Sequence, residues 1–179
     1  MITRRARRAT GLPETPCCHT FRRQDIDKHS GIVYDTAMST PQIVMDTNVF
    51  ITALRSRRGA SYKLFMLSNS GKFVVNVSVP LILEYEEVAK RLVGRIALTT
   101  RDMDHILDYV CSVVNQRAIF YLWRPFLKDP KDDMVLELAV SANCDFIVTY
   151  NQRDFQGAEK FGVQVVTPKE FLQEIGELP

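Results

Sequence analysis

Short runs of apolar residues recur along the chain after residue 41, and polar, Gly or Pro residues bound each of them. The runs are rich in Val, Ile and Phe and too short for independent helices, which is typical of buried β-strands. The pattern therefore predicts five strands, over Gln42–Met45, Phe73–Val77, Ala118–Trp123, Phe146–Thr149 and Val163–Val166.

Segments with helical periodicity separate these predicted strands. In the clearest segment, which starts at Thr100, apolar residues recur every three or four positions and charged residues occupy the other face. Ser and Thr with a following Pro mark two helix starts. The predicted helices run from Thr47 or Asn48 to Leu54, Ser61–Ser70, from a cap at Ser78 to about Leu92, Thr100–Asn115, roughly Asp132–Ala142, and onward from the capping-box sequence Thr167-Pro168-Lys169-Glu170.

The alternation of strands and helices predicts an α/β fold. Consecutive parallel strands are joined by right-handed helical crossovers, which place helices on both faces of the sheet. We therefore expect a three-layer α/β/α sandwich with a mainly parallel, four- to five-stranded sheet, formed by residues 42–179.

Residues 1–41 show no sustained hydrophobic periodicity, and we expect a poorly ordered N-terminal extension, because too little apolar surface is available to offset chain entropy. Their Arg-rich start is partly like an organelle transit peptide, but Asp25, Asp27 and Asp35 do not fit that pattern. A disordered arm that contacts RNA is another interpretation. We favour an over-extended start, since Met38 stands just before the foldable region.

Charge and composition narrow the class of protein. The net charge is +2, but residues 1–38 hold 7 basic and 4 acidic residues, which leaves 16 basic and 17 acidic residues in the remainder. The predicted domain is therefore not a basic nucleic-acid clamp overall, and RNA affinity would need a local patch. No apolar run is long enough to span a membrane. Isolated Cys111 and Cys144 fit reduced core cysteines, so we expect a cytoplasmic protein.

Acidic or amide side chains stand at four places where predicted elements begin or end. Asp46 follows the first strand, Glu84 lies early in the helix after the second, Asp132-Asp133 opens the helix before the fourth, and Asn151 and Asp154 follow the fourth. Each has an ordinary structural alternative, such as a helix cap, a turn or a surface ion pair. If the first and fourth strands are neighbours, however, all four places meet at one edge of the sheet, where oxygen ligands would suit a hard divalent cation.

The same residues carry a resemblance to a known family. The chain resembles PIN-domain nucleases, especially the bacterial branch grouped with toxins of toxin–antitoxin systems, over about residues 42–172. The resemblance rests on Glu84 and on the segments Val44-Met45-Asp46-Thr47-Asn48-Val49-Phe50, Asp129-Pro130-Lys131-Asp132-Asp133 and Phe146-Ile147-Val148-Thr149.

The resemblance implies an endoribonuclease that cleaves single-stranded RNA with Mg²⁺ or Mn²⁺, with an antitoxin protein or a second copy of the chain as further partners. It implies catalytic and metal-binding roles for Asp46, Glu84 and Asp133, with Asp133 preferred to Asp132 because it stands immediately before the apolar part of the helix. Polar support is implied for Thr47, Asn48 and Thr149. Where many members have a fourth acid, this chain has Asn151, and Asp154 is the alternative fourth ligand.

Two other kinds of protein share part of this pattern. A phosphoaspartyl phosphatase also places Asp after its first strand, but it needs a second acid two residues later, where this chain has Asn48. A non-catalytic module that binds RNA or protein is the stronger alternative, and Asn151 is compatible with it. In either an enzyme or a module, the basic cluster of Arg55, Arg57, Arg58 and Lys63 would contact RNA phosphates, unless it is only a solvated loop.

Overall fold

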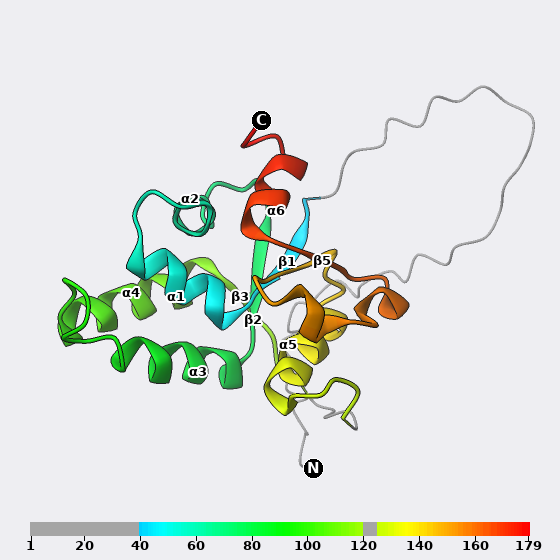
Figure 1. The fold of residues 1–179 in the computed structure, drawn as a ribbon, viewed down its shortest axis with the longest axis horizontal. Helices are drawn as coiled ribbons and strands as arrows, with labels where there is room; N and C mark the ends of the chain where they lie inside the picture. The colour runs from blue at the N-terminus through cyan, green and yellow to red at the C-terminus, as the bar shows by residue number, and fades with distance from the viewer. Residues whose placement is uncertain (1–39, 120–124) are drawn as a thin grey trace, which may run out of the picture. The chain divides into compact units, whose positions relative to one another are not determined.

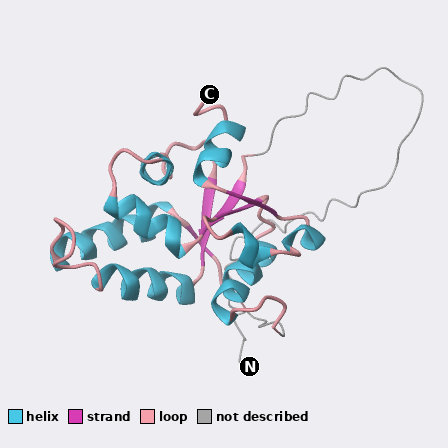
Figure 2. Cartoon of the chain, in the orientation of Figure 1, coloured by secondary structure: helices cyan, strands magenta, loops and turns pink. Residues whose placement is uncertain are grey.

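A parallel five-stranded sheet organises the part of the chain that the computed structural model describes, residues 40–119 and 125–179. The strand order is β3-β2-β1-β4-β5, and every neighbouring pair is parallel. Figure 1 shows α1, α3 and α4 on one side of this sheet and α5 on the other, and Figure 2 shows the strands as a central layer between helices. The predicted three-layer α/β/α architecture is therefore confirmed.

The strands and helices lie close to the predicted positions. The strands are β1 (Gln42–Met45), β2 (Val74–Val77), β3 (Asn115–Gln116), β4 (Phe146–Val148) and β5 (Gln164–Val166). The α-helices are α1 (Thr47–Arg55), α2 (Ala60–Met66), α3 (Val79–Lys90), α4 (Thr100–Val113), α5 (Pro130–Ser141) and α6 (Pro168–Glu174), and two 3₁₀ turns, η1 (Gln152–Phe155) and η2 (Ala158–Phe161), join β4 to β5.

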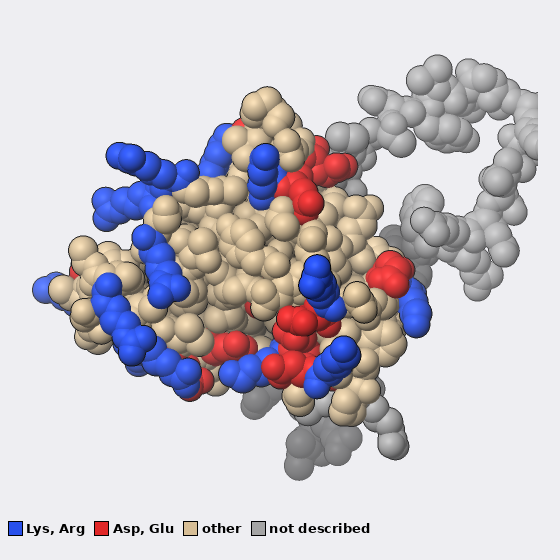
Figure 3. Space-filling view, in the orientation of Figure 1, with Lys and Arg blue, Asp and Glu red and all other residues tan. Residues whose placement is uncertain are grey.

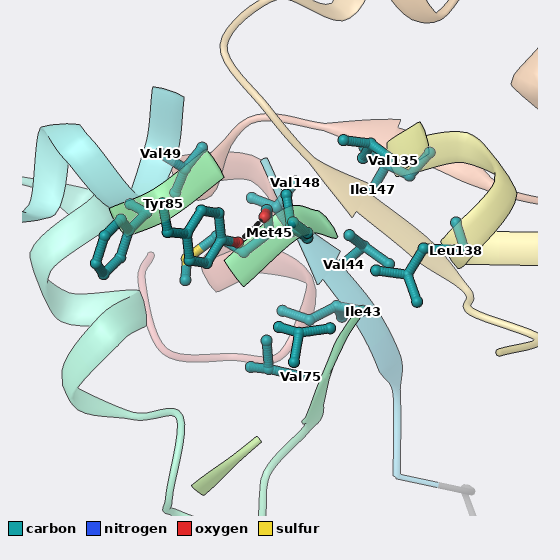
Figure 4. Close-up of a cluster of buried hydrophobic side chains, with 14 of the residues drawn as sticks. Ile43, Val44, Met45, Val49, Val75, Tyr85, Val135, Leu138, Ile147 and Val148 are labelled. Carbon is teal, nitrogen blue, oxygen red and sulfur yellow. Dashed lines mark hydrogen bonds between the residues drawn. The ribbon is translucent and has the colours of Figure 1, made fainter. Parts of the chain in front are cut away.

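The central strands are apolar because helices cover both faces of the sheet. Ile43 and Val44 on β1 and Ile147 on β4 are fully buried, and Figure 4 shows Val44 beside Leu138 of α5 and Ile43 beside Val75 of β2. Such continuous apolar runs are typical of parallel strands. The resulting core holds the ends of β1 and β4 in fixed positions.

Side-chain caps set several helix starts, as predicted. The Ser78 hydroxyl accepts from the Leu81 backbone N–H at the start of α3. Thr167 and Glu170 form a complete capping box at the start of α6. These caps satisfy backbone donors that the first turn of a helix leaves unpaired.

The third strand differs from its prediction. It is Asn115–Gln116, directly after α4, rather than Ala118–Trp123. Asn115 and Gln116 pair with Asn76 and Val77 of β2, so register with a neighbouring strand outweighs their low apolar character. Residues 118 and 119 form no strand, and the rest of the predicted strand lies outside the described residues. The helix predicted over Ser61–Ser70 also ends earlier, at Met66.

Some expectations about the chain as a whole can be compared only with the described residues. The predicted extension over residues 1–41 lies almost wholly outside the described residues, so the boundary stays a prediction. Of the two predicted core cysteines, Cys144 is buried and Cys111 is partly exposed, and neither forms a disulfide. None of the helices in residues 40–119 and 125–179 is both long and apolar enough to cross a membrane.

Candidate functional site

For a sheet with this strand order, a ligand-binding crevice is expected beyond the carboxyl ends of β1 and β4. The chain runs from β1 to β2 and β3 on one side and then returns to β4 on the other side of β1. In doubly wound sheets, ligands bind at such a reversal point, beyond the carboxyl ends of the two strands. Asp46 follows β1 there, and Thr149 follows β4.

The Asp46 carboxylate is held by two side chains. Asn48 Nδ2 and Thr149 Oγ1 donate to the same oxygen, Oδ2, at 2.7 Å and 2.6 Å. Neither of these bonds uses Oδ1. The Asp46 side chain is only 8% exposed, and burial is the main cause that raises its pKa above the usual value, against the lowering effect of hydrogen bonds from the Thr149 hydroxyl and from the Thr47 and Asn48 backbone N–H groups.

Thr149 and Asn48 form the rest of this network. The Thr149 hydroxyl, while donating to Asp46, accepts from Asn48 Nδ2 and from the Asn151 backbone N–H, both at 3.0 Å. A hydroxyl has one hydrogen and two lone pairs, so all of its bonding capacity is used. Asn48 Oδ1 in turn accepts from the Tyr150 backbone N–H at 3.2 Å. Both predicted supporting residues therefore fix the orientation of Asp46.

Glu84 reaches the same crevice from α3. The next residue, Tyr85, is fully buried, donates its hydroxyl to the Met45 carbonyl and stacks on Phe50 at 4.5 Å between ring centroids. Figure 4 shows this contact between the α3 tyrosine and the end of β1. Because Met45 precedes Asp46, the bond fixes the middle of α3, where Glu84 lies, relative to Asp46.

Burial, followed by the charge of Asp46, raises the pKa of Glu84, while Lys131 and Thr47 lower it. The Thr47 hydroxyl is buried without a hydrogen bond of normal length in the described residues, although it lies close enough to Glu84 to favour the ionised carboxyl. The third predicted supporting residue is thus at the crevice, with an unsatisfied oxygen.

The two aspartates that open α5 have different surroundings. Asp133 Oδ1 accepts from the backbone N–H groups of Leu127 and Phe126, at 2.8 Å and 3.1 Å, so its carboxylate anchors the segment before the helix. Asp132 instead has its pKa raised to about 6, first by burial and then by the charges of Asp46, Asp129, Asp154 and Glu84. The structure therefore favours Asp132 over Asp133 as the third acid of the crevice, contrary to the sequence-based preference, and we propose this reassignment.

The spacing of apolar residues along α5 distinguishes Asp132 from Asp133. Asp132 lies three, four and seven positions before Val135, Leu136 and Ala139, all of which are buried on the face of α5 that packs on the sheet. The corresponding stripe from Asp133 shares the buried Leu136 and continues through the buried but charged Glu137 and the partly exposed Val140, so it is the less apolar of the two. This difference supports the proposed reassignment to Asp132.

Asn151 and Asp154 follow β4. Both side chains are exposed, and η1 turns the chain so that the Asp154 N–H donates to the Asn151 carbonyl at 3.0 Å. The charge of Asp154 raises the pKa of both Asp46 and Asp132. Asp154 therefore lies within electrostatic reach of the cluster, and it is the better supported of the two candidates for a fourth acidic ligand.

The four carboxylates thus repel one another, and we call Asp46, Glu84, Asp132 and Asp154 the acidic cluster. Figure 3 shows red carboxylates gathered on the viewed face between α3 and α5, with Lys and Arg side chains beside them. Gathering like charges destabilises their ionised forms unless a cation or a proton compensates. The raised pKa values of Asp46, Glu84 and Asp132 reflect this situation, together with burial.

The donor set fits a hard divalent cation that keeps part of its water shell. In residues 40–119 and 125–179, no three His, Cys, Asp or Glu side chains converge closely enough to hold an ion by themselves. Mg²⁺ commonly takes one or two carboxylates directly and retains waters for its other positions. An oriented Asp46, an unsatisfied Thr47 oxygen and three further carboxylates are compatible with that mode of binding.

The four residues of the predicted basic cluster have different surroundings in the structure. Arg55, Arg57 and Arg58 are exposed around the turn between α1 and α2, and Arg55 and Arg57 line a groove of about 630 Å³. Lys63 instead pairs with the Glu177 carboxylate at 3.4 Å and donates to its backbone carbonyl. The three arginines therefore offer more open charge to a phosphate than Lys63 does.

Comparison with known proteins decides the family. The family model described as "PIN domain" matches residues 42–153, which is more than half of the chain. The chain belongs to the PIN-domain family. PIN-domain nucleases generally use divalent metal ions, in keeping with the oxygen donors of the acidic cluster.

Solved structures match this PIN domain over about seven tenths of the chain at low sequence identity. VapBC2 from Rickettsia felis, bound to a DNA fragment from its promoter, matches with a TM-score of 0.48 and 15% identity, covering 69% of this chain and 98% of the other. VapBC-1 from nontypeable Haemophilus influenzae matches with a TM-score of 0.49 and 17% identity, covering 71% and 98%. No curated protein matches the sequence.

Proposed function

We propose that this PIN domain is an endoribonuclease that cleaves single-stranded RNA with Mg²⁺ or Mn²⁺. The observation that supports the proposal most directly is the Asp46 carboxylate, oriented by Asn48 and Thr149 at the reversal point of the sheet and surrounded by other acids. Such a partly buried, repulsive cluster is costly for a folded protein and is typical of a site that binds cations.

In this proposal, Asp46, Glu84, Asp132 and Asp154 hold the ion, directly or through water. The bound ion would activate a water molecule and neutralise the charge that develops on the scissile phosphate. Asn48 and Thr149 keep Asp46 in one orientation, and Tyr85 fixes α3 and so the position of Glu84. Lys131, whose charge acts on Glu84, brings a cation to the edge of the cluster, where it can attract the RNA backbone.

The metal requirement and the role of Asp46 can be tested together. The purified full chain should cleave single-stranded RNA with Mg²⁺ or Mn²⁺ and stop when EDTA is added. Asp46→Asn should reduce the rate by about a hundredfold or more, since metal-ion stabilisation of a transition state is worth several kcal/mol. Asn keeps one acceptor oxygen for Asn48 and Thr149 but places a neutral amide nitrogen where Oδ1 stood.

Asp108→Asn is a matched control, because it makes the same change of charge at an exposed aspartate on α4. It should leave the cleavage rate unchanged. Full metal-dependent cleavage by Asp46→Asn would exclude Asp46 from the site, and equal loss in both variants would point to a general effect of charge.

The toxin-like resemblance of the motifs supports a more specific role. We propose that the chain acts in the cytoplasm as the toxin of a toxin–antitoxin pair, with an antitoxin protein as its partner and a homodimer as its assembly. Production of the full chain in a bacterial host should then arrest growth, and production of Asp46→Asn should not. Unimpaired growth with active, soluble protein would contradict the toxin role while leaving the nuclease proposal intact.

A non-catalytic module that binds RNA or protein is the second candidate. The observation in its favour is Asn151, a neutral residue where many relatives have an acid, together with the exposed position of Asp154. A module would bind RNA in EDTA and leave it intact in Mn²⁺. Metal-dependent cleavage that Asp46→Asn removes would exclude this candidate.

A further inference from the structure

Tyr150 places an exposed aromatic ring beside the acidic cluster. Its side chain is 45% exposed, and it directly follows Thr149, whose hydroxyl donates to Asp46. The Tyr150 backbone N–H donates to Asn48 Oδ1, so the same network that orients Asp46 also fixes the backbone of Tyr150. Nothing in the proposed metal site requires an aromatic side chain at this position.

The far end of the ring is fixed as well. The Tyr150 hydroxyl forms a 2.8 Å hydrogen bond with Ser61 Oγ, and Ser61 is fully buried in the first turn of α2. A tyrosine held at its backbone and at its hydroxyl loses little further rotamer freedom when a ligand covers its face. The bond therefore fixes the orientation of the Tyr150 ring and leaves its aromatic surface exposed.

Other exposed aromatic side chains in the described residues are already used by neighbouring rings. Phe126 and Phe161 pack edge to face, with centroids 5.1 Å apart, and Tyr109 packs against Phe65 at 6.0 Å. Tyr150 makes no comparable ring contact within residues 40–119 and 125–179. Its open face is thus available to a planar ligand.

The surroundings indicate which planar ligand fits. Tyr150 touches the start of α2, and the turn that leads into α2 contains the exposed Arg57 and Arg58. Proteins bind single-stranded nucleic acids by combining cations that follow the backbone with aromatic rings on which bases stack. We propose that Tyr150 stacks against one base of a single-stranded RNA next to the scissile phosphate, and that Ser61 positions its ring. The inference rests on the proposed function for the identity of the ligand.

The decisive measurement is binding in EDTA, where cleavage is expected to stop. A set of short single-stranded oligoribonucleotides, each with one abasic position, is titrated against the full chain and followed by fluorescence anisotropy. In the wild type, one abasic position should weaken binding by about tenfold, as stacking on one aromatic ring commonly does. In Tyr150→Ala, intact RNA should bind about tenfold more weakly, and the abasic effect at that position should vanish.

Two further variants separate stacking from a structural role of the side chain. Tyr150→Phe keeps the ring and loses the bond to Ser61, and Ser61→Ala removes the same bond from the other side. In both variants the abasic position should still weaken binding, but by less than in the wild type. The double variant Tyr150→Phe/Ser61→Ala should show the same loss of affinity as either single variant, because both substitutions remove the same bond. Tyr109→Ala, an exposed aromatic on α4, is the matched control and should leave the wild-type pattern unchanged.

An abasic effect of equal size in the wild type and Tyr150→Ala, or the absence of such a position or of binding, would overturn the proposal. One of these outcomes is expected if the Tyr150 ring contacts a protein partner and not an RNA base. Cleavage in Mn²⁺ is measured separately: Tyr150→Ala should raise KM about tenfold and change kcat little. If no variant or wild type cleaves RNA but the base-specific coupling to Tyr150 is present, the nuclease proposal fails and the stacking site stands.

Discussion

Asp132 and Asp133 are adjacent at the start of α5, yet their carboxylates make opposite contributions to the folded protein. Asp133 accepts the backbone N–H groups of Phe126 and Leu127 and so ties down the segment before the helix. Burial, and then the charges of Asp46, Asp129, Asp154 and Glu84, raises the pKa of Asp132 to about 6. One residue therefore stabilises the fold while its neighbour stabilises it only when protonated or beside a cation.

The raised pKa of Asp132 predicts a pH dependence of stability without metal. Its contribution is fully present below the unfolded pKa of 3.8 and is lost as the pH rises through about 6, because the unfolded state releases the proton first. Asp132→Asn should remove this loss, on the order of 1 kcal/mol after allowance for solvent screening. Denaturant unfolding in EDTA between pH 4 and pH 7 measures it, and an unchanged pH slope in the variant would contradict the assignment of Asp132.

Asp133→Asn is predicted to act in the opposite direction. It weakens the acceptor of the Phe126 and Leu127 N–H groups, and it should lower the free energy of unfolding by about 1–3 kcal/mol at pH 7. The stabilisation by Mn²⁺ should persist in this variant and shrink in Asp132→Asn. The reverse result would restore Asp133 as the metal ligand.

At the scale of whole elements, local signals in the sequence defined most boundaries correctly. Ser78 at the start of α3 and the Thr167–Glu170 box at the start of α6 act within one turn, so their effect can be derived from sequence. Strand β3 could not be derived this way, since Asn115 and Gln116 are strand residues only through pairing with β2. The Tyr150–Ser61 and Tyr85–Met45 bonds likewise join residues far apart in sequence, and no local pattern predicts them.

The contact between α3 and β1 gives a prediction at this scale. Tyr85→Phe removes the donor to the buried Met45 carbonyl while keeping the stacked ring on Phe50, and it should cost about 1–2 kcal/mol of stability. Because the bond fixes α3 near Asp46, affinity for Mn²⁺ should fall as well. Denaturant unfolding and metal titration are compared with Tyr109→Phe, which changes an exposed hydroxyl. Loss of stability with unchanged Mn²⁺ affinity would show that Glu84 does not depend on this contact.

Across the whole molecule, the position of the crevice follows from the strand order. Because β4 returns beside β1, residues about a hundred positions apart, Asn48 and Thr149, meet on one carboxylate. The sequence predicted that Asp46, Glu84 and the residues after β4 lie at one edge, since each stands in or directly after a recognisable element. It did not resolve which side chain of each pair faces inward, because that depends on how α5 and η1 pack.

The same whole-molecule view predicts that residues 1–37 add little to the stability of the domain. The sheet begins at Gln42, and the buried core runs from Ile43 to Leu172. A chain that starts at Met38 should therefore melt close to the temperature of the full chain. Calorimetry of both proteins gives the comparison, and a loss of several degrees, equivalent to about 1 kcal/mol, would mean that the removed residues pack on the domain.

The removed segment has seven basic and four acidic residues, so RNA affinity provides a second measurement. A contribution from its arginines would appear as a drop in RNA affinity at low salt that vanishes at high salt, with the melting temperature unchanged.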